Sequence, residues 1–140
     1  MVATPQRRYT ILMLKNRTVL VVEDEKPLAH ALKLKLSNAG FDVELAHDGE
    51  EALALTEEKV FDLIILDLIM PYVDGFVVLE TLKKRDHKSP VFVFSNLSQP
   101  EDEARVRALN AKEFFNKSAL SVNDMVAYIS KTIRAVELEE

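Results

Sequence analysis

Three carboxylates stand directly after two apolar runs of the sequence. Glu23 and Asp24 follow the run at 18–22, and Asp67 follows the run at 61–66. Carboxylates that share one site repel each other, so they stay ionised only beside a cation. A set of oxygen ligands without His or Cys favours a hard ion such as Mg²⁺. These residues therefore indicate a magnesium site, provided that the fold brings them together.

A hydroxyl group and an ammonium group follow two further segments in the same way. Ser95 comes after the apolar run at 91–94, and Lys117 comes after the short segment at 113–116. Both groups could neutralise the oxygens of a phosphoryl group. A carboxylate beside them could then accept that group and form an aspartyl phosphate. Asp67 is the best candidate for this nucleophile.

Five short segments have the composition of strands that could position these groups. The runs at 18–22, 61–66 and 91–94 are continuously apolar, which is typical of parallel strands buried on both faces. Weaker segments at 42–46 and 113–116 complete the set. Helical patterns separate and follow the strands, at 26–39, 48–59, 75–85, 104–109 and 122–136.

Capping residues mark the ends of several predicted helices. Gly40 supplies a stop after the first helix, and Asp48 is expected to cap the second. The strings that begin with Ser98 (S-x-x-E) and Ser121 (S-x-x-D) predict capping boxes before the fourth and fifth helices. Asn110, after the fourth helix, is suited to a positive φ angle.

The strict alternation of strands and helices predicts the fold class. It implies an α/β protein with a doubly wound, five-stranded parallel sheet flanked by five helices, because right-handed crossovers leave few other topologies. In such folds the ligand binds outside the carboxyl ends of the strands, near the point where the strand order reverses. The three carboxylates, the hydroxyl and the ammonium are all expected at that edge.

Length and composition limit the class of protein further. The chain has 140 residues, of which 48% are hydrophobic and 29% charged, as in one soluble globular domain. Its net charge of −5 disfavours nucleic-acid binding by this chain alone, and the absence of cysteine excludes disulfides and thiolate sites. The apolar run at 11–14 is too short to span a membrane, so we expect a cytoplasmic protein without a membrane partner.

The order and spacing of the polar residues resemble the receiver domain of two-component response regulators, from about residue 18 to residue 133. The string VVEDE at 21–25 is similar to the first-strand signature of the family. The string DLIMPYVDG at 67–75 is similar to its phosphoacceptor loop, and the pattern D-x-x-M-P-x-x-x-G is highly specific. The resemblance implies a CheY-like, flavodoxin-like fold with strand order 2-1-3-4-5, either stand-alone or excised from a longer regulator.

The resemblance also implies a role for each polar residue. Asp67 would accept a phosphoryl group from a histidine kinase or a phosphotransfer protein. Glu23, Asp24 and Asp67 would hold Mg²⁺, together with the backbone carbonyl of Ile69. Lys117 would pair with Asp67 or with its phosphate.

A change in packing would carry the signal to a partner. The resemblance implies that Ser95 moves toward the phosphoryl oxygen and that Phe114 turns into the space so opened, by packing alone because it lacks a hydroxyl. This movement repacks the face made by the fourth helix, the fifth strand and the fifth helix, which we call the switch face. The switch face is the expected surface for a downstream protein partner, and for a weak homodimer if the chain is not a monomer.

Two residues depart from the family pattern near the site. Ser118 follows Lys117 where the family commonly has a proline in a cis peptide, so we expect a trans peptide here. Asn96 follows Ser95 where a smaller residue is usual, and it could narrow the access of water to the phosphoryl group. Asn96 and Ile69 are therefore expected to modulate the lifetime of the phosphate, which we predict to be long.

Other functions fit the same residues less well. A phosphatase of the haloacid dehalogenase type needs a second Asp two residues after the nucleophile, where this chain has Ile69. We therefore expect no enzyme activity beyond self-phosphorylation and dephosphorylation. The three histidines, His30, His47 and His87, are scattered without ligand spacing and are expected to be surface or helix residues. The alternative that stays open is a receiver-like docking module that is never phosphorylated.

The sequence also suggests where the domain begins and ends. Residues 18–137 are expected to form the receiver domain. Residues 1–17 would be an N-terminal extension, ordered only in part or disordered, and residues 138–140 an acidic tail.

Overall fold

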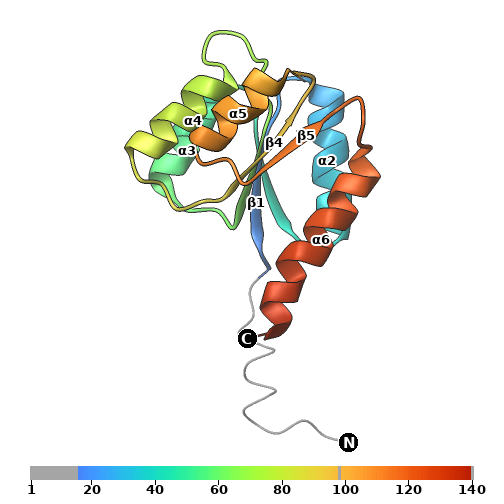
Figure 1. The fold of residues 1–140 in the computed structure, drawn as a ribbon. Helices are drawn as coiled ribbons and strands as arrows, with labels where there is room; N and C mark the ends of the chain where they lie inside the picture. Colours follow the sequence, from blue (N-terminus) through green and yellow to red (C-terminus); the bar gives the residue numbers. More distant parts are fainter. Residues whose placement is uncertain (1–15, 98, 140) are drawn as a thin grey trace, which may run out of the picture.

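The computed structural model describes residues 16–97 and 99–139, with side chains as far as Ile133. No helix within this part of the chain is both long and apolar enough to cross a membrane. The strands are β1 (Thr18–Val22), β2 (Asp42–Ala46), β3 (Leu63–Leu66), β4 (Val91–Ser95) and β5 (Glu113–Asn116). The helices are α2 (Lys26–Asn38), α3 (Gly49–Glu58), α4 (Gly75–Lys84), α5 (Pro100–Ala108) and α6 (Val122–Glu139) (Figure 1).

The strands form a single parallel sheet in the order β2-β1-β3-β4-β5. This arrangement confirms the predicted doubly wound α/β fold with strand order 2-1-3-4-5. The order reverses between β1 and β3, which are paired in register from Val19 with Leu63 to Val22 with Leu66. The carboxyl ends of the central strands therefore lie at one edge, where a doubly wound sheet binds its ligand.

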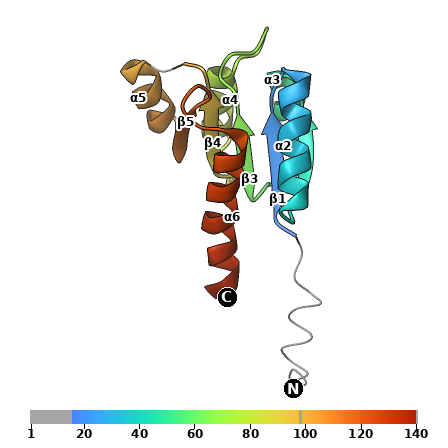
Figure 2. The ribbon, with the colours of Figure 1, turned by 90° about the vertical axis from the view of Figure 1, so that its right-hand side faces the viewer.

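Alternate side chains of the strands build one hydrophobic core on each face of the sheet. Val19 and Val21 of β1 lie in the core under α2 and α6, whereas Leu20 and Val22 lie in the core under α3, α4 and α5. Figure 2 shows α2 and α6 together on the near face of the sheet. Strands β1, β3 and β4 are buried almost throughout, as their continuous apolar runs predicted. The edge strands β2 and β5 are mostly half-buried.

Strand β3 is shorter at its start than the apolar run suggested, and side chains take part in the hydrogen bonds of the two residues before it. The backbone N–H of Phe61 donates to the hydroxyl of Ser89 at 2.7 Å. The carboxylate of Asp62 accepts from the backbone N–H of Thr18 at 2.8 Å. Residues 61 and 62 are thus held at the amino end of the sheet but stand outside the strand, which begins at Leu63.

The caps of two helices are those that the sequence predicted. Asp48 accepts a hydrogen bond from the backbone N–H of Glu51 at 2.8 Å, and the Ser121 hydroxyl accepts one from Asp124 at 3.1 Å. The reverse turns after two helices use residues that tolerate a positive φ. Gly40 has φ 98° after α2, and Asn110 has the predicted positive value, 74°, after α5.

The fourth helix begins earlier than the predicted range of 104–109, and the capping box predicted at Ser98 stays a prediction. Helix α5 begins at Pro100, with Gln99 at the N-cap and no hydrogen bond from the Gln99 side chain. Proline has no backbone N–H and its fixed φ suits the first helical position, so it sets the start of the helix. Ser98 itself lies outside the described residues, as do residues 1–15 of the expected extension and residue 140 of the tail.

Candidate functional site

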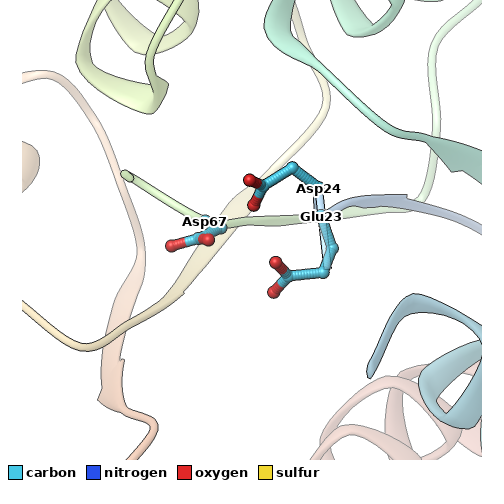
Figure 3. Close-up of side chains that lie close together, drawn as sticks. All are labelled: Glu23, Asp24 and Asp67. Carbon is cyan, nitrogen blue, oxygen red and sulfur yellow. The ribbon is translucent and has the colours of Figure 1, made fainter. Parts of the chain in front are cut away.

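The parallel register brings the three carboxylates together. Val22 and Leu66 are partners in the β1–β3 ladder, and the backbone N–H of Asp67 donates to the carbonyl of Val22 at 3.0 Å. The next residues along both strands are therefore neighbours at the carboxyl edge. One carboxylate oxygen each from Glu23, Asp24 and Asp67 lies within 4.8 Å of the others. Figure 3 shows the three side chains side by side.

Two of these carboxylates are almost fully buried. Glu23 is 2% exposed and Asp67 is 4% exposed, whereas Asp24 is half-buried and faces the opening. Burying a carboxylate is costly unless a cation or several hydrogen-bond donors replace the lost water. The burial of Glu23 and Asp67 therefore requires a positively charged group beside them.

Lys117 supplies that charge from the end of β5. Its Nζ lies 2.6 Å from an oxygen of Glu23 and 3.2 Å from an oxygen of Asp67. Its backbone N–H donates to the carbonyl of Ser95, which extends the β4–β5 ladder by one step and fixes the direction of the side chain. Lys117 thus lies where the sequence placed it, beside Asp67, but its shorter contact is with Glu23.

The site changes the acidity of the groups in it. Burial, together with the nearby charge of Asp67, raises the pKa of Glu23 to about 7, although Lys117 opposes this shift. Burial alone would lower the pKa of Lys117, but the hydrogen bond to Glu23 and the charge of Asp67 raise it above its usual value. The ammonium therefore stays protonated, while the carboxyl of Glu23 exchanges its proton near neutral pH.

The loop after β3 is shaped by Gly75. A Cβ atom on this residue would lie 2.4 Å from the carbonyl oxygen of Asp67 and 2.6 Å from the Cα of Leu68. The backbone N–H of Gly75 donates to the carbonyl of Leu68 at 3.0 Å, which closes the loop. The side chain of Asp67 accepts from the backbone N–H of Ile69 at 3.2 Å. The glycine at the end of the D-x-x-M-P-x-x-x-G pattern is therefore needed for close packing against the backbone of Asp67.

The two residues of the predicted switch lie beside the site in different surroundings. Ser95 is fully buried, and its hydroxyl accepts a hydrogen bond from the backbone N–H of Leu97 at 3.4 Å. Phe114 is the register partner of Val93 and packs, half-buried, against the core under α3, α4 and α5. The roles of both residues in a switch, and the movement itself, stay predictions.

The two departures from the family pattern meet in the structure. The Ser118 hydroxyl donates to the side-chain oxygen of Asn96 at 3.3 Å. The backbone N–H of Ser118 donates to the side-chain oxygen of Asn116 at 2.8 Å. The peptide between Lys117 and Ser118 is trans, as predicted, since no peptide bond between described residues is cis. The first of these bonds joins the loop after Ser95 to the loop that carries Lys117.

Two contacts of the site were missed by the sequence analysis. The bond between Lys117 and Glu23 joins residues 94 positions apart, and the bond between Asn96 and Ser118 joins two loops. Neither has a signal in the sequence, because each depends on the direction of a side chain at the edge of the sheet. The side chain of Ile69, whose carbonyl was predicted to bind the metal, is about half exposed at 52%.

The fold and the site together define a class of protein, namely an open parallel α/β domain with a buried acidic cluster at the carboxyl edge of its sheet. The family profile of the response regulator receiver domain matches residues 19–130. Because the match covers well over half of the chain, the chain belongs to this family and is a receiver domain of two-component signalling. Receiver domains interact with histidine kinases and with downstream partners, so the expected kinds of partner fit the family.

Curated relatives and solved structures agree with this assignment. The chain is 32% identical over 124 residues to the probable transcriptional regulator ycf27 of Porphyridium aerugineum, covering 89% of this chain and 51% of the relative. It is 31% identical over 123 residues to the alkaline phosphatase synthesis transcriptional regulatory protein PhoP of Bacillus subtilis, covering 88% of this chain and 51% of that protein. The chain thus spans about half the length of these relatives.

Among solved structures, the receiver domain of the Francisella response regulator 1452 is similar, with a TM-score of 0.76 and 31% identity. That match covers 84% of this chain and 99% of the Francisella chain. The chemotaxis protein CheY4 of Vibrio cholerae also has a TM-score of 0.76, at 26% identity, covering 84% of this chain and 98% of CheY4.

The residues of the acidic cluster suit a divalent metal ion. Their donor set consists of carboxylate oxygens, which are the ligands that hard cations prefer. Two of the three carboxylates are buried, so a bound cation would relieve their mutual repulsion. The cluster could therefore hold a metal at the carboxyl edge of the sheet.

Proposed function

We propose that this domain is a phosphoacceptor that receives a phosphoryl group on Asp67 in a Mg²⁺-dependent reaction. The observation that carries the proposal is the position of Asp67. Its buried carboxylate lies within 4.8 Å of the carboxylates of Glu23 and Asp24 and is 3.2 Å from the ammonium of Lys117. A carboxylate surrounded in this way can act as a nucleophile toward phosphorus while cationic groups neutralise the phosphoryl oxygens.

Glu23, Asp24, Asp67 and the backbone carbonyl of Ile69 would hold the metal ion. When bound, Mg²⁺ would supply positive charge that stabilises the phosphoryl oxygens. The four groups come from the two adjacent strand ends at which the strand order reverses. The raised pKa of Glu23 implies that metal binding displaces a proton from this carboxyl near neutral pH.

The reaction transfers one phosphoryl group to the carboxylate. An oxygen of Asp67 attacks phosphorus, and the bond from phosphorus to the donor, the P–N bond of a phosphohistidine or the P–O bond of an acyl phosphate, breaks. The donor leaves with the electron pair of that bond. Lys117 and Ser95 contact the transferred oxygens, and later attack by water returns Asp67 and inorganic phosphate. We propose no turnover of external esters, so the domain is not an enzyme beyond these steps.

A histidine kinase or a phosphotransfer protein would be the donor, and the switch face would be the output. This face would consist of α5, β5 and α6, and we expect Phe114 of β5 to link it to the site. A downstream protein partner, or a second copy in a weak homodimer, would bind there, with no nucleic-acid contact by this chain itself. The cytoplasm is the compartment we propose, since a chain without cysteine is compatible with reducing conditions.

Incubation with acetyl phosphate and magnesium, followed by intact mass measurement, tests the proposal. The wild type should gain the mass of one phosphoryl group, and neither Asp67→Asn nor a sample with chelator should gain it. Asp62→Asn is a matched control, because this carboxylate lies at the opposite end of the sheet beside Thr18. No added mass on the wild type would favour the alternative, a docking module that is never phosphorylated.

A further inference from the structure

Two histidines that are distant in the sequence lie together, and one of them, His47, contacts the backbone of Glu23. His30 belongs to α2, and His47 follows β2. Their ring centroids are 6.3 Å apart, with the ring planes tilted by 52°. The sequence analysis treated the histidines as scattered, because 16 residues separate these two. The packing of α2 against β2 creates the pair.

One hydrogen bond determines which nitrogen of His47 is free. The Nδ1 atom of His47 lies 3.4 Å from the backbone carbonyl oxygen of Glu23. A carbonyl can only accept, so Nδ1 must carry the proton. In the neutral ring the lone pair is then on Nε2. Metal-binding histidines are commonly oriented by such an N–H bond to a backbone carbonyl.

The separation of the rings is close to the value for two ligands of one ion. Zinc lies about 2.0–2.1 Å from each coordinating nitrogen, which places the centroids of two ligating imidazoles roughly 5 to 6 Å apart. The observed 6.3 Å is slightly longer. His30 is exposed, so a small rotation of its side chain can close the difference without disturbing the core.

We propose that His30 and His47 form a second cation site, which binds a borderline-soft divalent ion such as Zn²⁺. Its nitrogen donors distinguish it from the acidic cluster, whose oxygens suit Mg²⁺. The carboxylate of Glu51 accepts from the backbone N–H of His47 at 3.0 Å and adds negative charge near the pair. Water completes the coordination of the ion, and the bound ion ties α2 to the loop before α3.

Titration of the full chain with zinc chloride tests this site, with magnesium in large excess to occupy the acidic cluster. Binding is measured by calorimetry and by long-range nitrogen-proton NMR spectra of the imidazole rings, which report the tautomer and the metal-bound nitrogen. The variants are His30→Gln, His47→Gln and His87→Gln. The last is the matched control, because His87 is the third and remaining histidine of the chain and lies in the loop before β4.

The wild type should bind one zinc ion per chain, with the NMR shift on Nε2 of His47. His30→Gln and His47→Gln should each weaken binding roughly tenfold or more, and His87→Gln should leave it unchanged. His30 is exposed on a helix, so its variant remains informative even if His47→Gln fails to fold. Equal affinity in the wild type and His30→Gln, or no zinc-dependent change in the rings, would overturn the proposal. Neither result depends on phosphorylation of Asp67.

Discussion

Lys117 is the residue whose chemistry the structure defines most sharply. Its ammonium contacts two buried carboxylates, and its contact with Glu23 is shorter than its contact with Asp67. In the absence of a metal ion, Lys117 is therefore the cation that makes the burial of Glu23 and Asp67 tolerable. A metal ion bound by the same carboxylates would share that role.

Replacing Lys117 should destabilise the domain more in the absence of metal than in its presence. Lys117→Ala leaves two buried carboxylates without their ammonium, so we expect a loss of about 3 kcal/mol in the free energy of unfolding without magnesium. Magnesium should restore part of this loss, because it binds the variant's carboxylates without competition. Urea unfolding at several magnesium concentrations measures both effects. An identical loss at zero and saturating magnesium would contradict a shared role of lysine and metal.

Asn96 should control how long the phosphoryl group persists. Its side chain follows Ser95 and is held by the Ser118 hydroxyl at 3.3 Å. Asn96→Ala removes the side chain that is expected to narrow the access of water to the phosphoryl group. The half-life of the phosphorylated form should therefore fall about two- to tenfold, a change in rate that corresponds to the free energy of one hydrogen bond. Loss of phosphoryl mass over time measures the half-life.

Ser118→Ala separates the two contributions. It keeps the Asn96 side chain but removes the bond that holds it, so its half-life should lie between those of the wild type and Asn96→Ala. A half-life in Asn96→Ala that equals or exceeds that of the wild type would show that this residue does not shield the phosphate.

At the scale of elements, the turn between β3 and α4 depends on the absence of a side chain at Gly75. Gly75→Ala should lower the free energy of unfolding by about 2–3 kcal/mol, since its Cβ would overlap the backbone of Asp67. Magnesium affinity should fall as well, because the same backbone positions the Asp67 carboxylate. Val77→Ala, on the exposed side of α4, is the control and should change stability by less than about 1 kcal/mol. Wild-type stability in Gly75→Ala would mean that the loop adapts freely.

The loop between α4 and β4 contains a pH-sensitive connection to β3. His87 Nε2 lies 2.8 Å from the Ser89 hydroxyl, which also accepts from the backbone N–H of Phe61. Burial, and secondarily the charge of Arg85, lowers the pKa of His87 below its ordinary value of 6.5. The folded state thus favours the neutral ring, which can accept the hydroxyl proton of Ser89.

This connection makes stability depend on pH in one direction. A group whose pKa is lowered on folding stabilises the protein above its unfolded pKa, and this contribution is lost as the pH falls from about 6.5 through the folded pKa. Lowering the pH from 7.5 to 5.5 should therefore destabilise the wild type relative to His87→Gln, as measured by the midpoints of urea unfolding. The raised pKa of Glu23 acts in the opposite direction, but equally in both proteins. The same pH dependence in both proteins would exclude His87 as its source.

At the scale of the whole molecule, the sequence predicted the features of the fold and the site that follow from the order of the strands. Apolar runs located β1, β3 and β4, and the rule that ligands bind at the carboxyl ends of parallel strands placed Glu23 and Asp67 together. The details that escaped prediction depend on side chains that meet across loops, such as Lys117 with Glu23 and the pair His30 and His47. The fourth helix was predicted over 104–109, but α5 already begins at Pro100, whose fixed φ suits the first helical position.

The arrangement of the whole domain also explains how a change at one buried site could affect a partner that binds at the switch face. The acidic cluster lies where β1 and β3 end, and the β4–β5 ladder continues to Lys117, beside the switch face. A charge added at Asp67 would therefore act directly on Lys117, which follows the strand that holds Phe114, and we expect it to act on Ser95 as well. This connection has consequences only if Asp67 is the residue that receives the phosphoryl group.

Mapping the modified residue tests that claim most directly. Borohydride reduces an aspartyl phosphate to homoserine, which tandem mass spectrometry locates in the sequence. After treatment with acetyl phosphate and magnesium, homoserine should be found at position 67 and should be absent when magnesium is chelated. A reduced residue at position 23 or 24 instead, 5-hydroxynorvaline from Glu23 or homoserine from Asp24, or an unmodified residue 67 in fully folded protein, would contradict the account.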